Sequence, residues 1–486
     1  MSRLRNLLAA LLVCALALPL FAEDDDARFE LQYAKNFTFQ GGRVTIDHGF
    51  GDLVLRTHAS NQVSVRAVIR SSDPDVGRQI RVITGEGPTG VTIRTDYPEV
   101  RDRRGHLSYS VDMTVTVPVN APVTAKNQFG NTNARGLQTA SSIENKQGSI
   151  SFHDGRGSHS LANTFGSIEA TDNRGNLAIA NSNGSITVRN VDGALSATNR
   201  FGSISVTDVK NAVTLTNANG AIEAIDIHGP LKATNAFGSV TASTIGNAAD
   251  VTTSNGRIEL SNVSGQATVR NSFGQVNVKT VTGALTVAGD NTIVEADDIG
   301  GAATIATSFG AVTLRNVRGA ATVKSDNGKV SVSDINGSLT AATQFGAVQA
   351  ERIRGSATVT HNNGSVTLRD VTSSVKVRSS FGAVTIHGVG ASVDVANANG
   401  AISVSDLRAS GCQPVSLTTN FSTIRIGLPA DAAYNVNART SFGRVHSDFP
   451  IATTGVSEGV LRGTIGRGGC QLDLINANGN ITIDKD

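Results

Sequence analysis

Histidines, carboxylates and cysteines are the residues of this chain that could carry chemistry, and their spacing shows no catalytic pattern. His153, His159, His228, His361 and His387 fall at different phases of a regular repeat, and no Ser, His and Asp set accompanies them. The sequence contains no phosphate-binding loop, no paired-cysteine zinc pattern and no HExxH motif. Active sites usually break local regularity, and this repeat is unusually regular. We therefore expect no enzyme, no cofactor and no metal site.

Acidic and amide side chains form a row that could bind calcium. They recur at the sixth position after a glycine, at Asp154, Asp172, Asn190, Asp208, Asp226, Asn262, Asp298, Asn316, Asp334, Asp370 and Asp406. Their spacing matches neither the nonapeptide calcium repeat nor an EF-hand loop. We expect them instead to form turns through bonds from side chain to backbone.

The cysteines form one candidate pair. Cys14 lies in an apolar leader, which leaves Cys412 and Cys470 in the rest of the chain. Two cysteines in an exported protein are a candidate disulfide. Two free buried thiols are the alternative that the sequence leaves open.

One repeat positions all of these residues. A glycine returns at every eighteenth position from Gly130 to Gly400, with one break at Thr292. Ile, Val, Leu or Ala usually occupies the second, fourth, seventh, eleventh and thirteenth positions after it. Such self-similarity is typical of a solenoid whose coils pack only on their neighbours. The fold class expected is all-β, a single-stranded parallel β-solenoid (β-helix) with 18-residue coils. Corners are expected at the glycine and near the sixth position.

Phe and Asn alternate at the position before the glycine, so the full repeat spans two coils. The phenylalanines are Phe165, Phe201, Phe237, Phe273, Phe309, Phe345 and Phe381. Alternation of the strand residues predicts that this position faces inward, where each ring would fill the core. An exposed aromatic stripe that stacks on sugar rings is the alternative, and it requires the inward assignment to be wrong.

A second row of side chains lies at the fifteenth position after the glycine. It contains Asn163, Asn181, Asn199, Asn217 and Asn235, among others. Stacked asparagine amides can hydrogen-bond from coil to coil, so we expect this row to be structural.

Composition divides the chain into four regions. Residues 1–22 resemble a signal peptide, 23–125 a β-rich N-terminal region or cap, 126–408 the regular solenoid and 409–486 an irregular C-terminal cap. An uncleaved membrane anchor and a lipoprotein modified at Cys14 are alternatives for the first region. No other segment could cross a membrane as a helix, and a net charge of +2 with scattered signs argues against nucleic acid as a partner.

Three stretches resemble the bacterial putative-adhesin family, an extracytoplasmic domain of unknown function. They are residues 110–130, the tandem NxFGSIxx and NxNGxIxx units, and residues 415–450 with 463–483. The resemblance implies a β-solenoid outside the cytoplasm and brings no catalytic residues. Adhesion is suggested by the family's name, and some similar proteins are linked to envelope-stress regulation.

The expected function is that of a non-enzymatic, exported β-solenoid, an adhesin-like binding or structural protein at the cell envelope or surface. Its location would be periplasmic, at the outer surface or secreted, and its partner an unknown envelope, glycan or protein ligand. An envelope-stress regulatory or sensing protein is the alternative. A polysaccharide-active β-helix enzyme ranks third.

Overall fold

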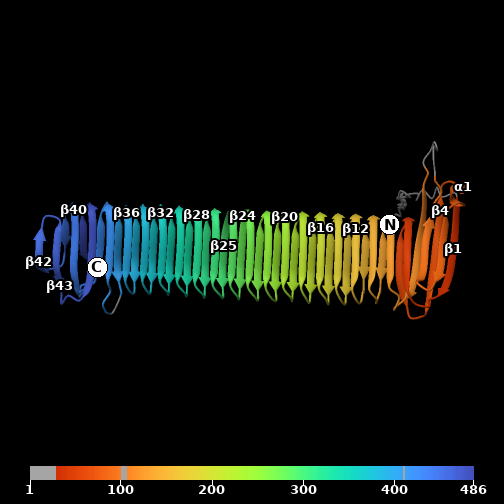
Figure 1. Ribbon diagram of the computed structural model, residues 1–486, viewed down its shortest axis with the longest axis horizontal. Helices are drawn as coiled ribbons and strands as arrows, with labels where there is room; N and C mark the ends of the chain where they lie inside the picture. Colours follow the sequence, from red (N-terminus) through yellow and green to blue (C-terminus); the bar gives the residue numbers. More distant parts are fainter. Residues whose placement is uncertain (1–28, 100–106, 409–410) are drawn as a thin grey trace, which may run out of the picture.

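The computed structural model describes residues 29–99, 107–408 and 411–486. Over these residues the chain forms a rod of stacked strands with one short helix, α1 (Pro74–Gly77), at its N-terminal end (Figure 1). The prediction of an all-β parallel solenoid is confirmed. The predicted signal peptide, residues 1–22, lies outside the described residues.

Each regular coil contributes one strand to each of two faces. In a representative coil, β16 (Leu195–Phe201) leads through a short corner into β17 (Ile204–Val209). Residues of β16 pair in parallel with the equivalent residues of the next coil, Leu195 with Val213 and Ala197 with Leu215. The cross-section is therefore flattened and two-sided, and each coil receives its backbone partners from the coils above and below.

Regular strands form two series of parallel neighbours. The first face contains β8 (Val123–Phe129), β10 (Ser141–Gln147), β12 (His159–Phe165), β14 (Leu177–Asn183), β16, β18 (Val213–Asn219), β20 (Leu231–Phe237), β22 (Ala249–Asn255), β26 (Ala303–Phe309), β28 (Ala321–Asn327), β30 (Leu339–Phe345), β32 (Ala357–Asn363), β34 (Val375–Phe381) and β36 (Val393–Asn399). The second face contains β9 (Thr132–Arg135), β11 (Ile150–His153), β13 (Ile168–Asn173), β15 (Ile186–Val191), β17, β19 (Ile222–Ile227), β21 (Val240–Ile245), β23 (Ile258–Val263), β27 (Val312–Val317), β29 (Val330–Ile335), β31 (Val348–Ile353), β33 (Val366–Val371), β35 (Val384–Val389) and β37 (Ile402–Leu407).

Two strands run through the corner without a break, β24 (Ala267–Val281) and β25 (Leu285–Ile299). They meet where Thr292 replaces the repeating glycine. Thr292 is fully buried, and its hydroxyl donates to the carbonyl of Asn271 at 2.9 Å. The backbone at Thr292 belongs to a strand, whereas most residues at this position of the repeat are glycines with a positive φ, and Ser422 at the equivalent position also has φ 95°. The break in the sequence repeat thus coincides with a local opening of the corner.

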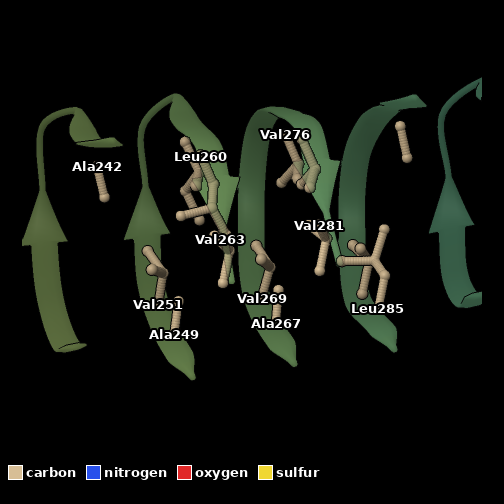
Figure 2. Packing of buried hydrophobic residues seen from close by; sticks show 14 of the residues in the cluster. Ala242, Ala249, Val251, Leu260, Val263, Ala267, Val269, Val276, Val281 and Leu285 are labelled. Carbon is tan, nitrogen blue, oxygen red and sulfur yellow. The ribbon is translucent and has the colours of Figure 1, made fainter. Parts of the chain in front are cut away.

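The core is a thin layer of small and β-branched side chains between the two faces. In one coil Ile204, Val206, Val209, Val213 and Leu215 are all buried, at the positions expected from the repeat. Figure 2 shows the same arrangement further along the rod, where alanine, valine and leucine side chains point into the space between the strands. Large rings are uncommon in this narrow interior, where Phe152 is fully buried among smaller side chains.

The first corner requires glycine for two reasons. Gly202 has φ +118°, a conformation that side chains rarely adopt, and a Cβ there would lie 2.3 Å from the carbonyl oxygen of Gly184 in the adjacent coil. Gly220 stands in the same relation to Gly202. The glycine row is therefore set by the close approach of successive coils.

The second corner is made by one left-handed residue per coil, at the sixth position. The non-glycine residues with φ near +55° are Asp154, Asp172, Asn190, Asp208, Asp226, Thr244, Asn262, Thr280, Asp298, Asn316, Asp334, Arg352, Asp370 and Asp406. Asp and Asn tolerate this conformation better than other residues with a side chain. These residues form the second corner, as expected. They do so through their left-handed backbone conformation, not through the expected bonds from side chain to backbone. The Asn190 side chain, for example, bonds to Asp172 of the adjacent coil at 2.5 Å.

The coil order at the N-terminal end differs from the chain order. The strands are β1 (Phe29–Thr38), β2 (Arg43–Phe50), β3 (Leu53–His58), β4 (Gln62–Ser71), β5 (Arg81–Gly87), β6 (Gly90–Asp96) and β7 (Tyr109–Pro118). The β2–β3 coil stacks directly on β8 and β9, while β6 and β7 pair with its other side. Antiparallel strands β5, β4 and β1 then finish this end. One coil of the predicted N-terminal region thus belongs to the solenoid.

The C-terminal end is rearranged in the same way. Its strands are β38 (Val415–Phe421), β39 (Ile424–Leu428), β40 (Tyr434–Phe442), β41 (Val445–Ser447), β42 (Ile451–Ser457), β43 (Val460–Ile465), β44 (Cys470–Asn478) and β45 (Ile481–Lys485). The last coil of the chain, β44–β45, lies between β38–β39 and β40–β41. An antiparallel hairpin of β42 and β43 follows β40 and covers its remaining edge.

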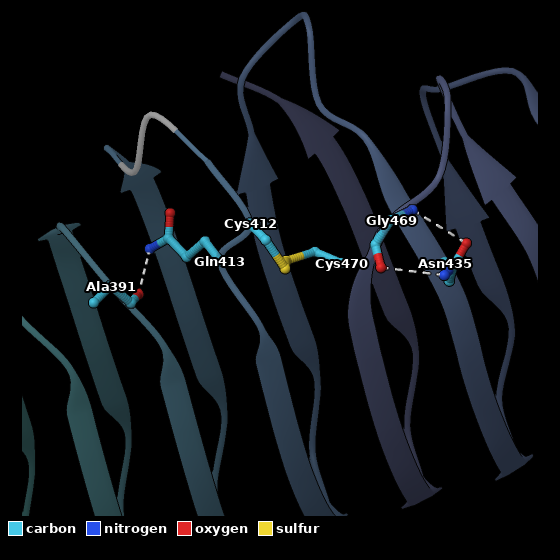
Figure 3. The surroundings of a disulfide bond; sticks show 6 residues. All are labelled: Ala391, Cys412, Gln413, Asn435, Gly469 and Cys470. Atoms are coloured by element: carbon cyan, nitrogen blue, oxygen red, sulfur yellow. Dashed lines mark hydrogen bonds between the residues drawn. A yellow bond between two sulfur atoms is a disulfide. The ribbon is translucent and has the colours of Figure 1, made fainter.

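A disulfide joins Cys412 and Cys470 at the start of two adjacent coils, with their Cα atoms 5.1 Å apart (Figure 3). Beside it, the Gln413 amide donates to the Ala391 carbonyl at 2.6 Å, and Asn435 accepts from and donates to Gly469. The bond spans 58 residues of sequence and fastens the inserted coil to the regular solenoid.

Replacing a strained residue at the second corner should stabilise the protein. Left-handed backbone costs a β-branched residue about 1–2 kcal/mol, and asparagine less. We expect Thr244→Asn to raise the free energy of unfolding by about 1 kcal/mol in urea denaturation. The reverse exchange at an equivalent position, Asp226→Thr, should lower it by a similar amount. Equal stability of both variants and the parent protein would show that this corner is not strained.

Removing the disulfide should loosen the C-terminal cap alone. A cross-link closing a loop of 58 residues stabilises by roughly 2–4 kcal/mol. In the Cys412→Ser, Cys470→Ser double variant, amide hydrogen exchange should accelerate within 411–486 and stay unchanged within 141–260. Unchanged protection of the cap would mean that strand pairing alone closes this end.

Candidate binding surface

One edge of the rod carries a row of exposed aromatic rings. The exposed phenylalanines of the described residues outside the core are Phe129, Phe165, Phe201, Phe237, Phe273, Phe309, Phe345, Phe381, Phe421 and Phe442, with exposed fractions from 38% to 74%. On the coils between them the same position holds Gln147, Asn183, Asn219, Asn255, Asn291, Asn327, Asn363, Asn399 and Asn478. We call this combined row the Phe–Asn edge.

The expectation that these rings fill the core is wrong. Phe165, Phe237 and Phe309 are each more than half exposed. Strand pairing explains the difference, because Asn199 pairs with Asn217 and Phe201 with Asn219, while the residue between them has no partner in the register. The pleat therefore slips before the phenylalanine, not at the glycine, and turns the ring outward.

In some coils the asparagine two positions before the edge residue bonds to the backbone at this slip. In the coil of Phe201, the side-chain oxygen of Asn199 accepts the backbone N–H of Arg200 at 3.0 Å. That N–H is thereby removed from the strand ladder, and the same bond forms at Asn163 and Asn181. A local side chain to backbone bond of this kind competes with regular pairing.

The asparagine row is buried and links adjacent coils, though differently from the expectation. Each side-chain amide donates to the carbonyl of a corner glycine in the neighbouring coil, and the bonds run from Asn163 to Gly148, Asn181 to Gly166, Asn199 to Gly184, Asn217 to Gly202 and Asn235 to Gly220, at 2.9–3.0 Å. The predicted bonding between stacked amides is replaced by bonding from amide to glycine carbonyl. The row thus fixes the corner beneath each exposed ring.

Alternation of Phe and Asn continues where the chain order is broken. Phe421 pairs with Asn478, and Asn478 pairs in turn with Phe442. Asn478 comes from the last coil of the chain, inserted between two coils that are closer in sequence. The alternation is therefore a property of the assembled surface, and no sequence period could have revealed it here.

Spacing along the edge follows from the stacking of strands. Adjacent parallel strands lie ~4.8 Å apart, so rings on every second coil recur every ~9.6 Å. At the N-terminal end, Phe50 of the adjacent β2–β3 coil pairs in register with Phe129, so that two rings occupy neighbouring coils. Their centroids are 4.8 Å apart and their planes differ by 3°, a face-to-face stack.

One constellation of catalytic residue types does come together in space. The Nδ1 atom of His387 lies 3.1 Å from the Ser405 hydroxyl, and its Nε2 lies 3.7 Å from the Asp406 carboxylate. Arg408 also bonds to that carboxylate and lowers the pKa of Asp406 below its usual value. The Asp406 carboxylate is thus already paired with the Arg408 guanidinium, and the group lies on an open surface. The three residues lie on two adjacent coils, so the sequence search missed them.

No group of three or more His, Cys, Asp or Glu residues within 29–99, 107–408 and 411–486 could hold a metal ion. The row of acids at the second corner is spread along the rod, one or fewer per coil. Neighbouring basic residues bind some of its members, as Arg352 does for Asp334 at 2.6 Å. Within the same described ranges, no helix is long and apolar enough to cross a membrane.

Histidines replace asparagine at two positions of the buried row. His361 Nε2 lies 2.7 Å from the Gly346 carbonyl, to which it donates a hydrogen bond as the asparagine amides do. His48 pairs in register with Asn127 and is fully buried in the β2–β3 coil. Burial lowers the pKa of His48 to about 4.

The fold and the edge define a repeat protein of the parallel β-solenoid class, with a continuous exposed edge and no assembled metal centre in the described residues. Residues 321–484 match the Toastrack DUF4097 family. This segment of the chain is therefore similar to that family of unknown function, which agrees with the resemblance to putative adhesins.

Two solved structures share a limited likeness with the chain. One is a putative cell adhesion protein from Clostridium sporogenes ATCC 15579, with 8% identity, a TM-score of 0.18, and 43% of this chain and 100% of the other covered. The second is a putative adhesin from Bacteroides fragilis NCTC 9343, with 11% identity, a TM-score of 0.20, and coverage of 61% and 97%. No curated protein matches the sequence. Scores this low carry no structural or functional argument.

Acid should destabilise the protein through His48. The native state keeps this imidazole neutral down to about pH 4, whereas the unfolded chain takes up a proton below its ordinary pKa of 6.5. Stability is thus complete above pH 6.5 and declines as the pH falls toward 4, by roughly 3 kcal/mol at about 1.36 kcal/mol per pKa unit.

The His48→Asn variant, which restores the residue of the row, should show a smaller decline in urea denaturation between these pH values. His446→Asn, at an exposed site, is the control and should behave like the parent protein. An identical pH dependence of His48→Asn and the parent would contradict the assignment.

Proposed function

We propose that this protein acts outside the cytoplasm as a non-enzymatic, adhesin-like binding protein of the cell envelope or surface, and that the Phe–Asn edge is its binding surface. The observation that carries the proposal is the row of ten exposed phenylalanines on one edge. Soluble proteins rarely expose apolar surface in a continuous patch unless it meets a partner. Here the exposure recurs at every second coil and persists through the rearranged C-terminal end.

The architecture suits adhesion because it repeats one weak site along a rigid support. A single ring between small side chains offers little binding energy, but sites fixed on one rod engage together and add their contributions. The flattened coils are tied to each other by backbone pairing and by the asparagine bonds beneath the rings. The rings therefore hold their positions before the partner arrives, which reduces the entropy lost on binding.

Export is supported by two features. The leader at residues 1–22 has basic residues followed by an apolar run. The disulfide between Cys412 and Cys470 is of a kind that persists in oxidising compartments outside the cytoplasm.

Absence of an enzymatic role is part of the same proposal. The edge itself carries only Phe, Asn and Gln at its repeating position, none of which titrates near neutral pH. Away from the edge, the carboxylate beside His387 is bound by Arg408.

A binding assay on bacterial cells and isolated envelopes tests the proposal. The triple variant Phe237→Ser, Phe273→Ser, Phe309→Ser should retain the fold, since the rings are half exposed, and lose at least tenfold in apparent affinity. A matched control removes exposed apolar side chains away from the edge, with Leu31→Ser and Ile83→Ser. Circular dichroism verifies the β-solenoid in every variant. Equal binding by the triple variant and the parent protein would place adhesion elsewhere.

A further inference from the structure

We infer that the partner of the Phe–Asn edge is the same edge of a second copy of this chain, docked antiparallel, with the rings of each copy entering the Asn levels of the other. This rests on the proposed function, because it takes the edge as the binding surface and names what binds there. Three observations support this pairing. They are the spacing of the rings, the conformation of the asparagine side chains and the symmetry that a pair of identical chains must have.

The gap between successive rings fits one further ring. Rings on alternate coils are ~9.6 Å apart, so a ring inserted midway would lie ~4.8 Å from each neighbour. The protein already contains this stack, since Phe50 and Phe129 occupy adjacent coils at 4.8 Å and 3°. Offset or parallel aromatic pairs at such distances are favourable.

The Asn levels leave that gap open. The Asn183 amide is bonded back to the Thr164 carbonyl at 3.2 Å, and the Asn219 amide to the Arg200 carbonyl at 3.4 Å. These side chains therefore lie against the strand instead of standing up between the rings. Their carbonyl oxygens can accept the edge hydrogens of an inserted ring, whose rim is electropositive.

The residues flanking the edge are mostly short. The position before each edge residue and the position after the corner glycine are dominated by Ser, Ala and Thr, as at Ala236, Ser239 and Ala311. The rings consequently project beyond most of their surroundings. Longer side chains flank some levels, among them Arg200, whose guanidinium lies 5.3 Å from the centroid of the Phe201 ring.

The distance between successive rings decides between possible partners, because a partner that contacts every ring must repeat at the same distance. A partner must repeat every ~9.6 Å, twice the strand spacing, over the length of the row. A second copy meets this condition at every ring because it has the same coils. An extended β-(1→4)-linked glycan has a two-sugar repeat of similar but unequal length, so its rings would drift out of step over many coils. The full row therefore selects another stack of the same coils.

Symmetry then fixes the direction of the two rods. A two-fold axis parallel to the rods would place Phe opposite Phe and Asn opposite Asn, which forbids interdigitation. A two-fold axis perpendicular to the rods reverses one of them and allows a shift by one coil, so that each Phe meets an Asn level. A closed, isologous pair must therefore be antiparallel.

The area available is sufficient for a stable pair. A phenylalanine buries about 150–250 Å² when fully covered, so a half-exposed ring contributes about 100 Å². Ten such rings give about 1,000 Å² per copy and about 2,000 Å² in total, at the upper end of the range of about 1,200–2,000 Å² for specific complexes. Antiparallel rods projecting from two cells would meet in this way, which links self-pairing to adhesion.

Sedimentation velocity over a concentration series tests the pairing. The parent protein should form a dimer, and Phe237→Ser, Phe273→Ser, Phe309→Ser should raise the dissociation constant at least tenfold. The decisive variant fills the gaps instead, with Asn219→Phe, Asn255→Phe and Asn291→Phe. It exposes more apolar surface, so non-specific association would strengthen, whereas interdigitation predicts that the dimer weakens. Strengthened association would overturn the proposal.

Spin labels test the direction. Cys412 and Cys470 are joined in a disulfide, so in a Cys14→Ser background Ser160→Cys and Lys376→Cys introduce single reactive sites on exposed positions near opposite ends of the row. In an antiparallel dimer a Ser160 label lies far from its symmetry mate and close to a Lys376 label of the other copy in a mixed sample. Close approach of two Ser160 labels would indicate parallel rods and overturn the geometry.

The binding assay separates this inference from the proposed function. A chain that stays monomeric at every concentration, yet binds envelopes or a β-(1→4)-linked glycan such as chitin through the same rings, refutes self-pairing and leaves the adhesive role intact. A chain that neither pairs nor binds envelopes refutes both. A dimer that survives both sets of edge substitutions refutes the assigned interface.

Discussion

The close approach of corner glycines in successive coils is the constraint on which the rest of the structure depends. A Cβ at Gly202 would meet the Gly184 carbonyl at 2.3 Å, so a side chain could not be added at this corner without moving the backbone. The carbonyl brought near by this contact is the same one that accepts the amide of Asn199 at 2.9 Å. In this coil the side-chain oxygen of Asn199 also accepts the next backbone N–H, at the point where the pleat slips and Phe201 turns to the surface. Glycine, asparagine and phenylalanine thus meet at one corner of the coil.

The sequence predicted much of this architecture because the repeat expresses it many times. The core positions, the coil length and both corners follow from periodicity, and residues such as Ile204 and Val213 are buried as expected. Arg200 and Phe201 show where the inference failed. Alternation assumes that every residue stays in the paired register, whereas Arg200 has no partner between Asn199 and Phe201. The same gap occurs before Phe309, where Thr307 replaces the asparagine, so no single residue type signals the slip.

Two other features lay beyond the sequence for a different reason. The coil insertions at both ends are long-range pairings that break the period, so no local pattern specifies them. The grouping of His387, Ser405 and Asp406 arises from stacking of successive coils, whose scattered surface residues look unrelated along the chain. Sequence periodicity reports the residues that recur in every coil. The coil insertions and the His387 grouping depend instead on residues that occur in individual coils.

The inserted final coil has a consequence for how the protein is made. Since β44 and β45 lie between strands that are synthesised earlier, β40 has no parallel neighbour until the last residues of the chain are available. The regular coils can stack progressively from the N-terminal side. At the C-terminal end, however, the edges of β38 and β40 stay unpaired until β44 has been synthesised. A chain that stopped at Gly469, just before β44, would lose a layer from inside the stack, not from its tip. Pairing of β44 and β45 therefore acts as a built-in check that the chain has been produced as far as these strands.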